Sequence, residues 1–232
     1  MKDYSQSGEQ AAILDVFRLL PGYGFHKRFD ATSGEERTKC QWCDKPESLW
    51  EGSCKSEMRG RFLDIGAYHP TVFSNTRALY ELGWSGVMFE PSPGPMRALV
   101  AEYGNEPRIE LVQAAVSLTP GAVLLHVTDD AVSTSCPDEY EVWREKGGYI
   151  GKLLVPALTV ADILNRWGSF DFVNIDAEGV SADLFLEFLR RDQMSPCYCV
   201  EVDVGRLNEM MTAASAAGYT AKVIGANLVL SR

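Results

Sequence analysis

Acidic residues that follow short apolar runs are the side chains of this chain best suited to chemistry. Glu90 ends the run GVMFE, and Asp176 and Glu178 follow the run FDFVNI. Carboxylates accept hydrogen bonds from hydroxyl groups and remove protons. When such runs are parallel strands, their carboxyl ends meet at one edge of the sheet, where ligands bind. The sequence therefore predicts a polar ligand site at that edge.

The stretch Arg61–Pro91 has the order expected of a β-α-β unit that binds a nucleoside. A short apolar run is followed at once by Gly66 and Ala67, small residues that allow a sharp turn and leave the backbone open to a ligand. A helix and a second strand follow, and the second strand ends on Glu90. In such a unit the turn holds the charged end of the ligand, and Glu90 accepts hydrogen bonds from two ribose hydroxyls.

Apolar periodicity and turn residues predict strands that alternate with helices, and therefore a mostly parallel sheet. Strands are expected at Phe62–Ile65, Gly86–Phe89, Ile109–Val112, Gly121–Val127, Phe170–Ile175, Tyr198–Val202, Thr220–Ile224 and Asn227–Leu230. Helices are expected at Glu9–Leu20, Ser74–Gly83, Pro93–Tyr103, Thr159–Gly168, Ser181–Leu189 and Arg206–Ala217. The last two strands form an antiparallel hairpin. We expect one α/β domain over residues 1–232, with helices on both faces of the sheet.

A long irregular loop is expected at Thr128–Lys152. It contains Ser133, Thr134 and Ser135 together with several aromatic residues, a set suited to a polar organic ligand. Loops of this length without regular structure are typical of lids and binding loops. A loop that is merely mobile is the competing interpretation.

Composition argues against several classes of partner. The chain has 232 residues, of which 46% are hydrophobic, and a net charge of -10. Binding to phosphates needs Lys and Arg, so the charge argues against nucleic acids and against anionic membranes. No apolar run approaches the length of a membrane span, and the first residues lack the basic and then apolar order of a signal peptide. We therefore expect a cytoplasmic protein.

A polar stretch at residues 25–60, expected to be an insertion, contains three of the six cysteines. Cys40, Cys43 and Cys54 lie close together in the sequence. Two cysteines separated by two residues can hold a zinc ion, and His26 is the nearest candidate for a fourth ligand. Free thiols on a flexible insertion are the alternative.

Two nucleotide chemistries compete for the predicted site. Dinucleotide oxidoreductases usually carry GxGxxG, which lets a pyrophosphate rest against a helix N-terminus. Here Asp64 precedes Gly66, and no second glycine follows at that spacing. An acid in the turn repels a pyrophosphate, whereas it suits the ammonium and sulfonium groups of S-adenosylmethionine. A third hypothesis is a non-catalytic interaction module that binds the cofactor and uses the cysteine-containing stretch as its partner surface.

Several motifs resemble those of the FkbM-type S-adenosylmethionine-dependent methyltransferases. The matching pieces run from Tyr4 to about Glu187, in the order YSQSGEQ, FLDIGAYHP, SNT, GWSGVMFEP, QAAVS and FVNIDAEGVSADLF. The resemblance implies a Rossmann-like class I methyltransferase sheet of seven strands with a reversed last strand. It also implies O-methylation of a small-molecule acceptor, through a hydroxyl of a sugar or of a polyketide-like natural product. His69-Pro70 stands where family members commonly have another glycine.

The resemblance also implies which residues hold the cofactor. By this likeness Asp64 and Gly66 shape the methionine pocket, and Glu90 holds the ribose. Gln113 and Ala114 lie beside the adenine. The other residues expected at the cofactor are Ala67, Tyr68, Asn75 and Pro91.

Methyl transfer to oxygen is an in-line displacement, in which the enzyme positions the nucleophile and removes its proton. Asp176 is expected to act as the base or to orient the acceptor hydroxyl. Glu178 can share this task, or the two acids can hold a divalent metal. His69 is an alternative base, because an unperturbed imidazole has a pKa of about 6.5. Capping of the following helix is the structural alternative for both acids.

Overall fold

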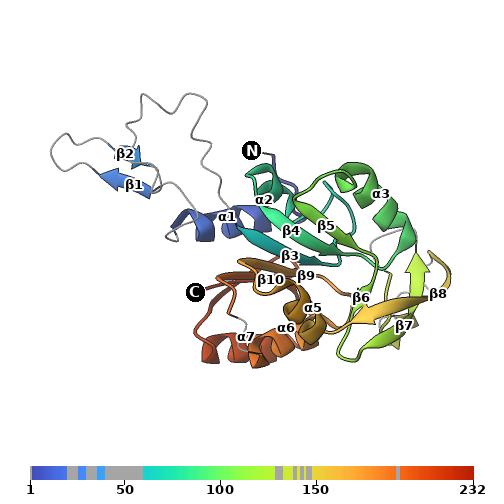
Figure 1. The fold of residues 1–232 in the computed structure, drawn as a ribbon. Helices are drawn as coiled ribbons and strands as arrows, with labels where there is room; N and C mark the ends of the chain where they lie inside the picture. The colour runs from blue at the N-terminus through green and yellow to red at the C-terminus, as the bar shows by residue number, and fades with distance from the viewer. Residues whose placement is uncertain are drawn as a thin grey trace.

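A seven-stranded sheet in the order β11-β12-β10-β9-β3-β4-β5 forms the centre of the fold (Figure 1). The computed structural model describes residues 2–19, 26–29, 36–39, 60–128, 133–137, 140–141, 144, 148–191 and 194–232. The strands of the sheet are β3 (Arg61–Ile65), β4 (Ser85–Phe89), β5 (Ile109–Val112), β9 (Phe172–Ile175), β10 (Cys197–Glu201), β11 (Thr220–Ile224) and β12 (Asn227–Ser231).

Strand directions agree with the sequence prediction. β5, β4, β3, β9 and β10 pair in parallel, whereas β12 runs antiparallel to both of its neighbours. The sheet is therefore Rossmann-like and mostly parallel, and it ends in the predicted C-terminal antiparallel hairpin. After β3 the chain adds β4 and β5 on one side of it, and it then adds β9 on the other side. The strand order therefore reverses between β3 and β9. Ligands of open α/β sheets bind at such a reversal.

Helices cover both faces of the sheet (Figure 1). One face packs against α1 (Glu9–Leu19), α2 (Arg77–Glu81) and α3 (Pro93–Tyr103). The other packs against α5 (Val160–Trp167), α6 (Ser181–Arg190) and α7 (Leu207–Ala216). The alternation of side chains along a strand explains the two cores, since Phe62 of β3 belongs to the first cluster and Leu63 and Ile65 to the second.

A smaller sheet of β6 (Ala115–Val116), β8 (Tyr149–Leu158) and β7 (Gly121–Thr128) stands beside the central one (Figure 1). β7 and β8 form a long antiparallel pair. The prediction of an irregular loop as far as Lys152 is therefore wrong from Tyr149 onward. β8 carries Pro156, a residue that argues against a strand in sequence, and most of its side chains are exposed, so it shows no clear alternation.

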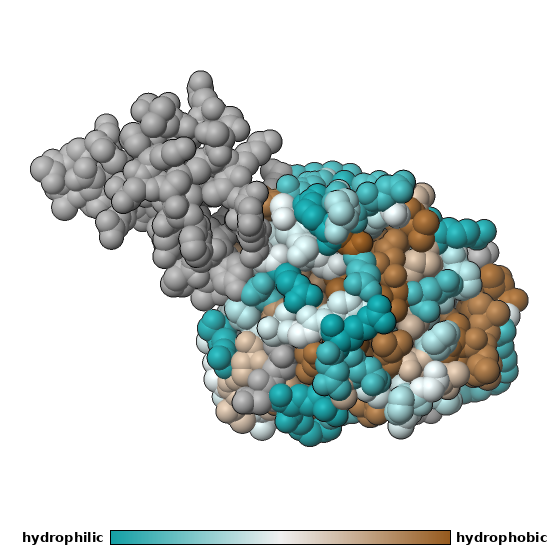
Figure 2. Space-filling model, viewed as in Figure 1, coloured by the Kyte–Doolittle hydropathy of each residue, from teal (hydrophilic) through white to brown (hydrophobic). Residues whose placement is uncertain are grey.

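The outer face of this smaller sheet carries exposed apolar side chains. Leu124 of β7 lies directly opposite Leu154 of β8, and both are exposed. Figure 2 shows brown, hydrophobic surface on the part of the molecule where β7 and β8 lie. The opposite face is buried through Leu125, Val127 and Val155.

The stretch between α1 and β3 is only partly described. β1 (His26–Phe29) and β2 (Glu36–Lys39) pair antiparallel, an element that the sequence did not predict. Cys40, Cys43 and Cys54, predicted as zinc ligands, lie outside the described residues. No helix within the described part of the chain is long and apolar enough to cross a membrane.

Local signals set the ends of several helices. Thr159 caps α5 in the predicted capping box, in which its hydroxyl and the Asp162 carboxylate bond each other's backbone N–H groups. α2 is shorter than predicted and begins at Arg77, although the Ser74 hydroxyl still accepts a hydrogen bond from the Arg77 N–H.

Replacement of Thr159 by alanine removes this cap, and we expect Thr159→Ala to lower the free energy of unfolding by about 1 kcal/mol. The melting temperature of a chain of this size then falls by about 2–4 °C. Thermal unfolding followed by circular dichroism measures the change. Thr119→Ala, at an exposed position outside any helix, is the control and should leave the melting temperature unchanged. An equal loss in both variants would contradict the role of the cap.

Candidate active site

A cavity of about 310 Å³ opens at the carboxyl edge of the central sheet, where β3, β4, β9 and β10 end. Its wall combines residues that follow these strands with Gln6 from the N-terminal segment and with residues 133–135. The sequence-predicted site residues that line it are Gly66, Tyr68, Glu90, Pro91, Ala114, Asp176 and Glu178. Residues from distant parts of the sequence therefore meet at the reversal of strand order.

Gly66 brings the turn after β3 into backbone contact with the end of β9. Its φ is +81°, and its N–H donates a hydrogen bond of 3.0 Å to the carbonyl of Phe89. A Cβ atom at this position would lie 1.7 Å from the carbonyl oxygen of Asp176. Glycine is thus required by its conformation and by the close approach of two backbones.

Glu90 is a buried carboxylate at the end of β4, held by backbone N–H groups. One oxygen accepts a hydrogen bond of 2.9 Å from Tyr68, and the other accepts one of 2.7 Å from Ser92. Burial raises the pKa of Glu90 to about 7, partly offset by these two bonds. Because a carboxylate oxygen accepts more than one bond, both oxygens keep capacity for ligand hydroxyls.

Asp64 lies outside the cavity lining, between β9 and the start of α2. Its carboxylate accepts a hydrogen bond of 2.5 Å from the Thr76 hydroxyl and one of 2.9 Å from the Asn174 amide. Burial raises its pKa. Side chains alternate along β3, so Asp64 faces the opposite side of the sheet from Leu63 and Ile65. The structure therefore places Asp64 in a buried link between β3, β9 and the start of α2, outside the cavity lining.

Three further predicted cofactor residues also lie outside the cavity lining. The Asn75 amide donates a hydrogen bond of 3.0 Å to the Asn174 side chain and belongs to the same buried network as Asp64. Ala67 is buried in the core, and Gln113 is exposed. Asn75 and Ala67 therefore lie on the buried side of the turn after β3.

The side chain of His69, predicted as an alternative base, forms hydrogen bonds within its own loop. Its Nδ1 accepts hydrogen bonds of 3.1 Å from the backbone N–H groups of Thr71 and Val72. It does not line the cavity. Nδ1 of His69 is therefore engaged in the turn, and the ring lies outside the cavity that contains the acids.

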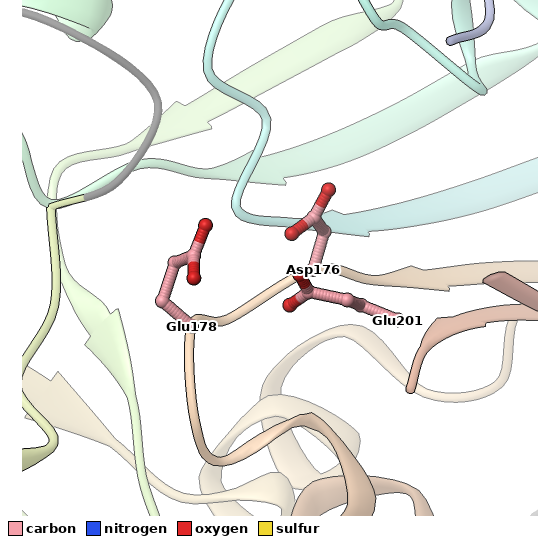
Figure 3. A group of neighbouring side chains, drawn as sticks. All are labelled: Asp176, Glu178 and Glu201. Atoms are coloured by element: carbon pink, nitrogen blue, oxygen red, sulfur yellow. The ribbon is translucent and has the colours of Figure 1, made fainter. Parts of the chain in front are cut away.

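Three carboxylates converge in the cavity (Figure 3). Asp176 and Glu178 follow β9, and Glu201 is the last residue of the neighbouring strand β10. One oxygen of each lies within 4.8 Å of the others. Glu201 lies within the strand predicted at Tyr198–Val202 but was not among the predicted site residues. Its position at the end of a strand next to β9 is the same signal that identified Asp176.

Asp176 and Glu201 share a hydrogen bond, which requires a proton on one of them. Burial, together with the other acids nearby, raises the pKa of Asp176 to about 6 and that of Glu201 to about 10. The pair of acids therefore retains a proton at a pH at which ordinary carboxyl groups have lost theirs. Oε2 of Glu201 is buried without a hydrogen-bond partner.

The charge of the cavity is strongly one-sided. Its described lining contains the acids Glu90, Asp176, Glu178 and Glu201, and none of the described lining residues is Lys or Arg. Such a site favours a cationic ligand and disfavours phosphates. The acids also offer the hard oxygen donors that Mg²⁺ and Ca²⁺ prefer.

Two aromatic residues on the cavity wall have left-handed backbone conformations. Tyr68 has a φ of +48° and Phe73 a φ of +56°, and among the described residues they alone combine a side chain with a positive φ. Such a conformation costs about 1–3 kcal/mol and persists only where the surroundings impose it. Strain of this kind is found at ligand-binding loops.

Residues 133–135 of the predicted binding loop lie in the cavity wall. Thr134 pairs with His126 of β7 through two backbone hydrogen bonds, and its hydroxyl donates one of 2.9 Å to the carbonyl of Glu178. The loop is thus fastened both to the smaller sheet and to the segment that carries the acids. Tyr140, another predicted loop residue, packs on the His126 ring rather than in the cavity.

Comparisons with known proteins agree with this architecture. Residues 64–219 match the family model of the methyltransferase FkbM domain. No curated protein matches the chain. A solved structure similar to this one is the methyltransferase FkbM from Methylobacillus flagellatus KT, with 13% sequence identity and a TM-score of 0.51. The similarity covers 75% of this chain and 44% of that one, so this chain spans less than half of its length.

A weaker similarity links the chain to precorrin-6y C5,15-methyltransferase from Geobacter metallireducens GS-15. The identity is 10% and the TM-score 0.41, over 74% of this chain and 78% of that one.

The contact between Gly66 and Asp176 predicts that Gly66→Ala is strongly destabilising. The added Cβ atom forces apart two backbone segments and also strains a positive φ, so we expect a loss of at least about 3 kcal/mol in unfolding free energy. Gly94→Ala is the matched control, because no atom lies within 4 Å of its added Cβ. Urea unfolding measures both. Equal stability of the two variants would show that the turn can move without cost.

The raised pKa of Glu201 predicts an unusual dependence of stability on pH. A carboxyl with a higher pKa in the folded state stabilises the fold at low pH, and this contribution is lost as pH rises from about 4.5 to about 10. Glu201→Gln should therefore melt higher than the parent protein at pH 8, with the difference shrinking toward pH 5. Melting temperatures across this range test the sign. A difference that grows as pH falls would rule out a proton on Glu201.

Proposed function

Because this chain belongs to the FkbM methyltransferase family, we propose that it transfers a methyl group from S-adenosylmethionine to a hydroxyl of a small molecule, a sugar or a natural product of the polyketide kind. The observation that carries the proposal is one cavity that joins a buried carboxylate suited to a ribose, Glu90, to a carboxylate suited to proton removal, Asp176. Gly66 lines the same cavity, and its lack of a side chain lets the turn after β3 approach the backbone of Asp176.

The residues present fit S-adenosylmethionine. Glu90 retains acceptor capacity for two ribose hydroxyls, and Pro91 and Ala114 line the same cavity. The acidic lining suits the sulfonium and ammonium groups of this molecule and repels the pyrophosphate of a dinucleotide. Because Asp64 lies outside the cavity lining, the acids that do line it are what favour a methyltransferase over a dinucleotide-dependent oxidoreductase.

S-Adenosylmethionine, when bound, supplies an electrophilic methyl group. The residues of this chain have two roles, which are to place the acceptor hydroxyl beside that methyl group and to take the hydroxyl proton. Asp176 is the proposed base, because its pKa is raised less than that of Glu201, so that it is the acid of the pair that loses its proton more readily. A pKa raised to about 6 makes Asp176 a stronger base than an ordinary aspartate while leaving it mostly unprotonated at pH 7.

Glu201 and Glu178 have supporting roles in this proposal. Protonated Glu201 donates its hydrogen bond to Asp176 and so fixes the direction of the carboxylate. Glu178 lies on the same cavity wall, and its backbone carbonyl is held by Thr134. Apolar residues such as Ile65, Phe89 and Leu125 complete the wall and limit the access of water.

Replacement of Asp176 by asparagine tests this assignment. We expect Asp176→Asn to lower kcat by about 10²- to 10⁴-fold, because the base is lost while the side chain keeps its size. Calorimetric binding of S-adenosylmethionine, measured separately, should change little. In the parent protein kcat/KM should fall as pH drops below about 6, where Asp176 becomes protonated, and this limb should be absent from any residual activity of the variant.

Two controls separate the alternatives. If Asp176 acts as a base, turnover survives treatment with EDTA, whereas a loss that Mg²⁺ restores would assign the acids to a metal. Full turnover in Asp176→Asn would remove this residue from the chemistry. Binding of S-adenosylmethionine without methyl transfer to any acceptor would favour the non-catalytic module.

A further inference from the structure

We infer that Tyr68 and Phe73 form an acceptor platform, a surface that receives the flat apolar face of a neutral ring whose edge carries the hydroxyl to be methylated. The inference rests on the proposed function and extends it to the class of acceptor. Sugar rings and aromatic rings both offer such a face, and the test below distinguishes them.

The two rings are arranged as a pair. They are nearly parallel, with an angle of 17° between their planes and 6.4 Å between their centroids. Both line the cavity that contains the three acids, and Phe73 is 50% exposed. Because burial of a Phe side chain is favourable, an exposed ring on a cavity wall is a surface available to an apolar partner.

The strain in this loop indicates that the ring positions are imposed by the rest of the fold. Tyr68 and Phe73 both have positive φ values. The loop between them is fixed by the His69 ring, and the N–H of Ser74 donates a hydrogen bond of 2.9 Å to the carbonyl of Tyr4. The Tyr103 hydroxyl donates to the carbonyl of Pro70 over 3.3 Å. None of these bonds involves the two rings, so ring variants should keep the loop.

The Tyr68 backbone also links the platform to the proposed cofactor site. Its N–H donates to Glu90, the residue suited to the ribose. The ring of Phe73 has no such link among the described contacts, so Phe73 is the better position for a test.

The charge of the cavity further restricts the class of acceptor that can bind. Four acidic side chains, of which Asp176 and Glu201 share a proton, line the cavity together with no described Lys or Arg. A phosphorylated or carboxylated acceptor would meet repulsion from these acids. A neutral ring can place its apolar face on the platform and direct a hydroxyl toward Asp176. Acyclic polyols carry hydroxyl groups but have no flat apolar ring face that could pack on the platform.

Methyl transfer from labelled S-adenosylmethionine to four probes tests the class of acceptor. The probes are methyl glucoside, phenol, the acyclic polyol mannitol and glucose 6-phosphate. We expect at least one of the two neutral ring alcohols to be methylated, with a kcat/KM about tenfold or more above those of mannitol and glucose 6-phosphate. The arm that is active identifies the ring as a sugar or as an aromatic. Preference for mannitol or glucose 6-phosphate, or transfer to none of the probes, would overturn the inference.

Phe73→Ala tests the platform itself. The KM for the active ring alcohol should rise about tenfold, while the Kd for S-adenosylhomocysteine stays within about twofold of the parent value. Phe73→Trp should restore the acceptor KM. Val72→Ala is the control, because Val72 is 43% exposed on the same loop but lies outside the cavity lining. An unchanged acceptor KM in Phe73→Ala, or an equal loss of S-adenosylhomocysteine binding, would contradict the platform.

A stability measurement gives a readout that is independent of the acceptor. Phe73→Gly removes the ring and the strain, whereas Phe73→Ala removes the ring alone. The glycine variant should therefore melt at the higher temperature, although glycine ordinarily costs more entropy on folding. A lower melting temperature would show that the backbone is unstrained there.

These outcomes are distinct from failure of the proposed function. If the parent protein does not bind S-adenosylmethionine, the methyltransferase proposal fails, whatever the ring variants do. If the parent protein methylates a ring alcohol and Phe73→Ala does so equally well, the methyltransferase proposal is supported and the platform inference is contradicted.

Discussion

The close contact between the turn after β3 and the end of β9 is the constraint on which the site depends. Gly66 allows two backbone segments to meet at a distance that no other residue permits. The contact fixes the turn beside the cavity that Glu90 and Asp176 line from the ends of two different strands. Behind the turn, Asp64, Thr76 and Asn174 hold β3, α2 and β9 together through buried hydrogen bonds.

The site concentrates negative charge that the fold must tolerate. Buried acids are costly unless they are paired or protonated. The structure reduces this cost by different means at different positions. Glu90 is held by backbone N–H groups, Asp64 by a hydroxyl and an amide, and the pair of Asp176 and Glu201 by a shared proton. The arrangement resembles a receptor for a cation more than a scaffold optimised for stability.

Much of the fold could be predicted because strands, turns and helix caps have local signals. The β-α-β unit, the antiparallel hairpin and the capping box of Thr159 are all present. Side-chain direction was harder, since Asp64 and Gly66 are two residues apart but only Gly66 lines the cavity. β8 was hidden by Pro156 and by its exposed side chains, and the role of His69 in its loop depends on a turn that no spacing rule describes.

The proton held between Asp176 and Glu201 has a thermodynamic consequence for ligand binding. A cation that enters the cavity stabilises the deprotonated acids, so part of this proton is released to the solvent when the cation binds. By linkage, raising the pH strengthens binding of the cation to the same degree that the cation weakens binding of the proton. The heat of binding then includes the ionisation heat of the buffer. Binding of a cation in this cavity would thus exchange one positive charge for another.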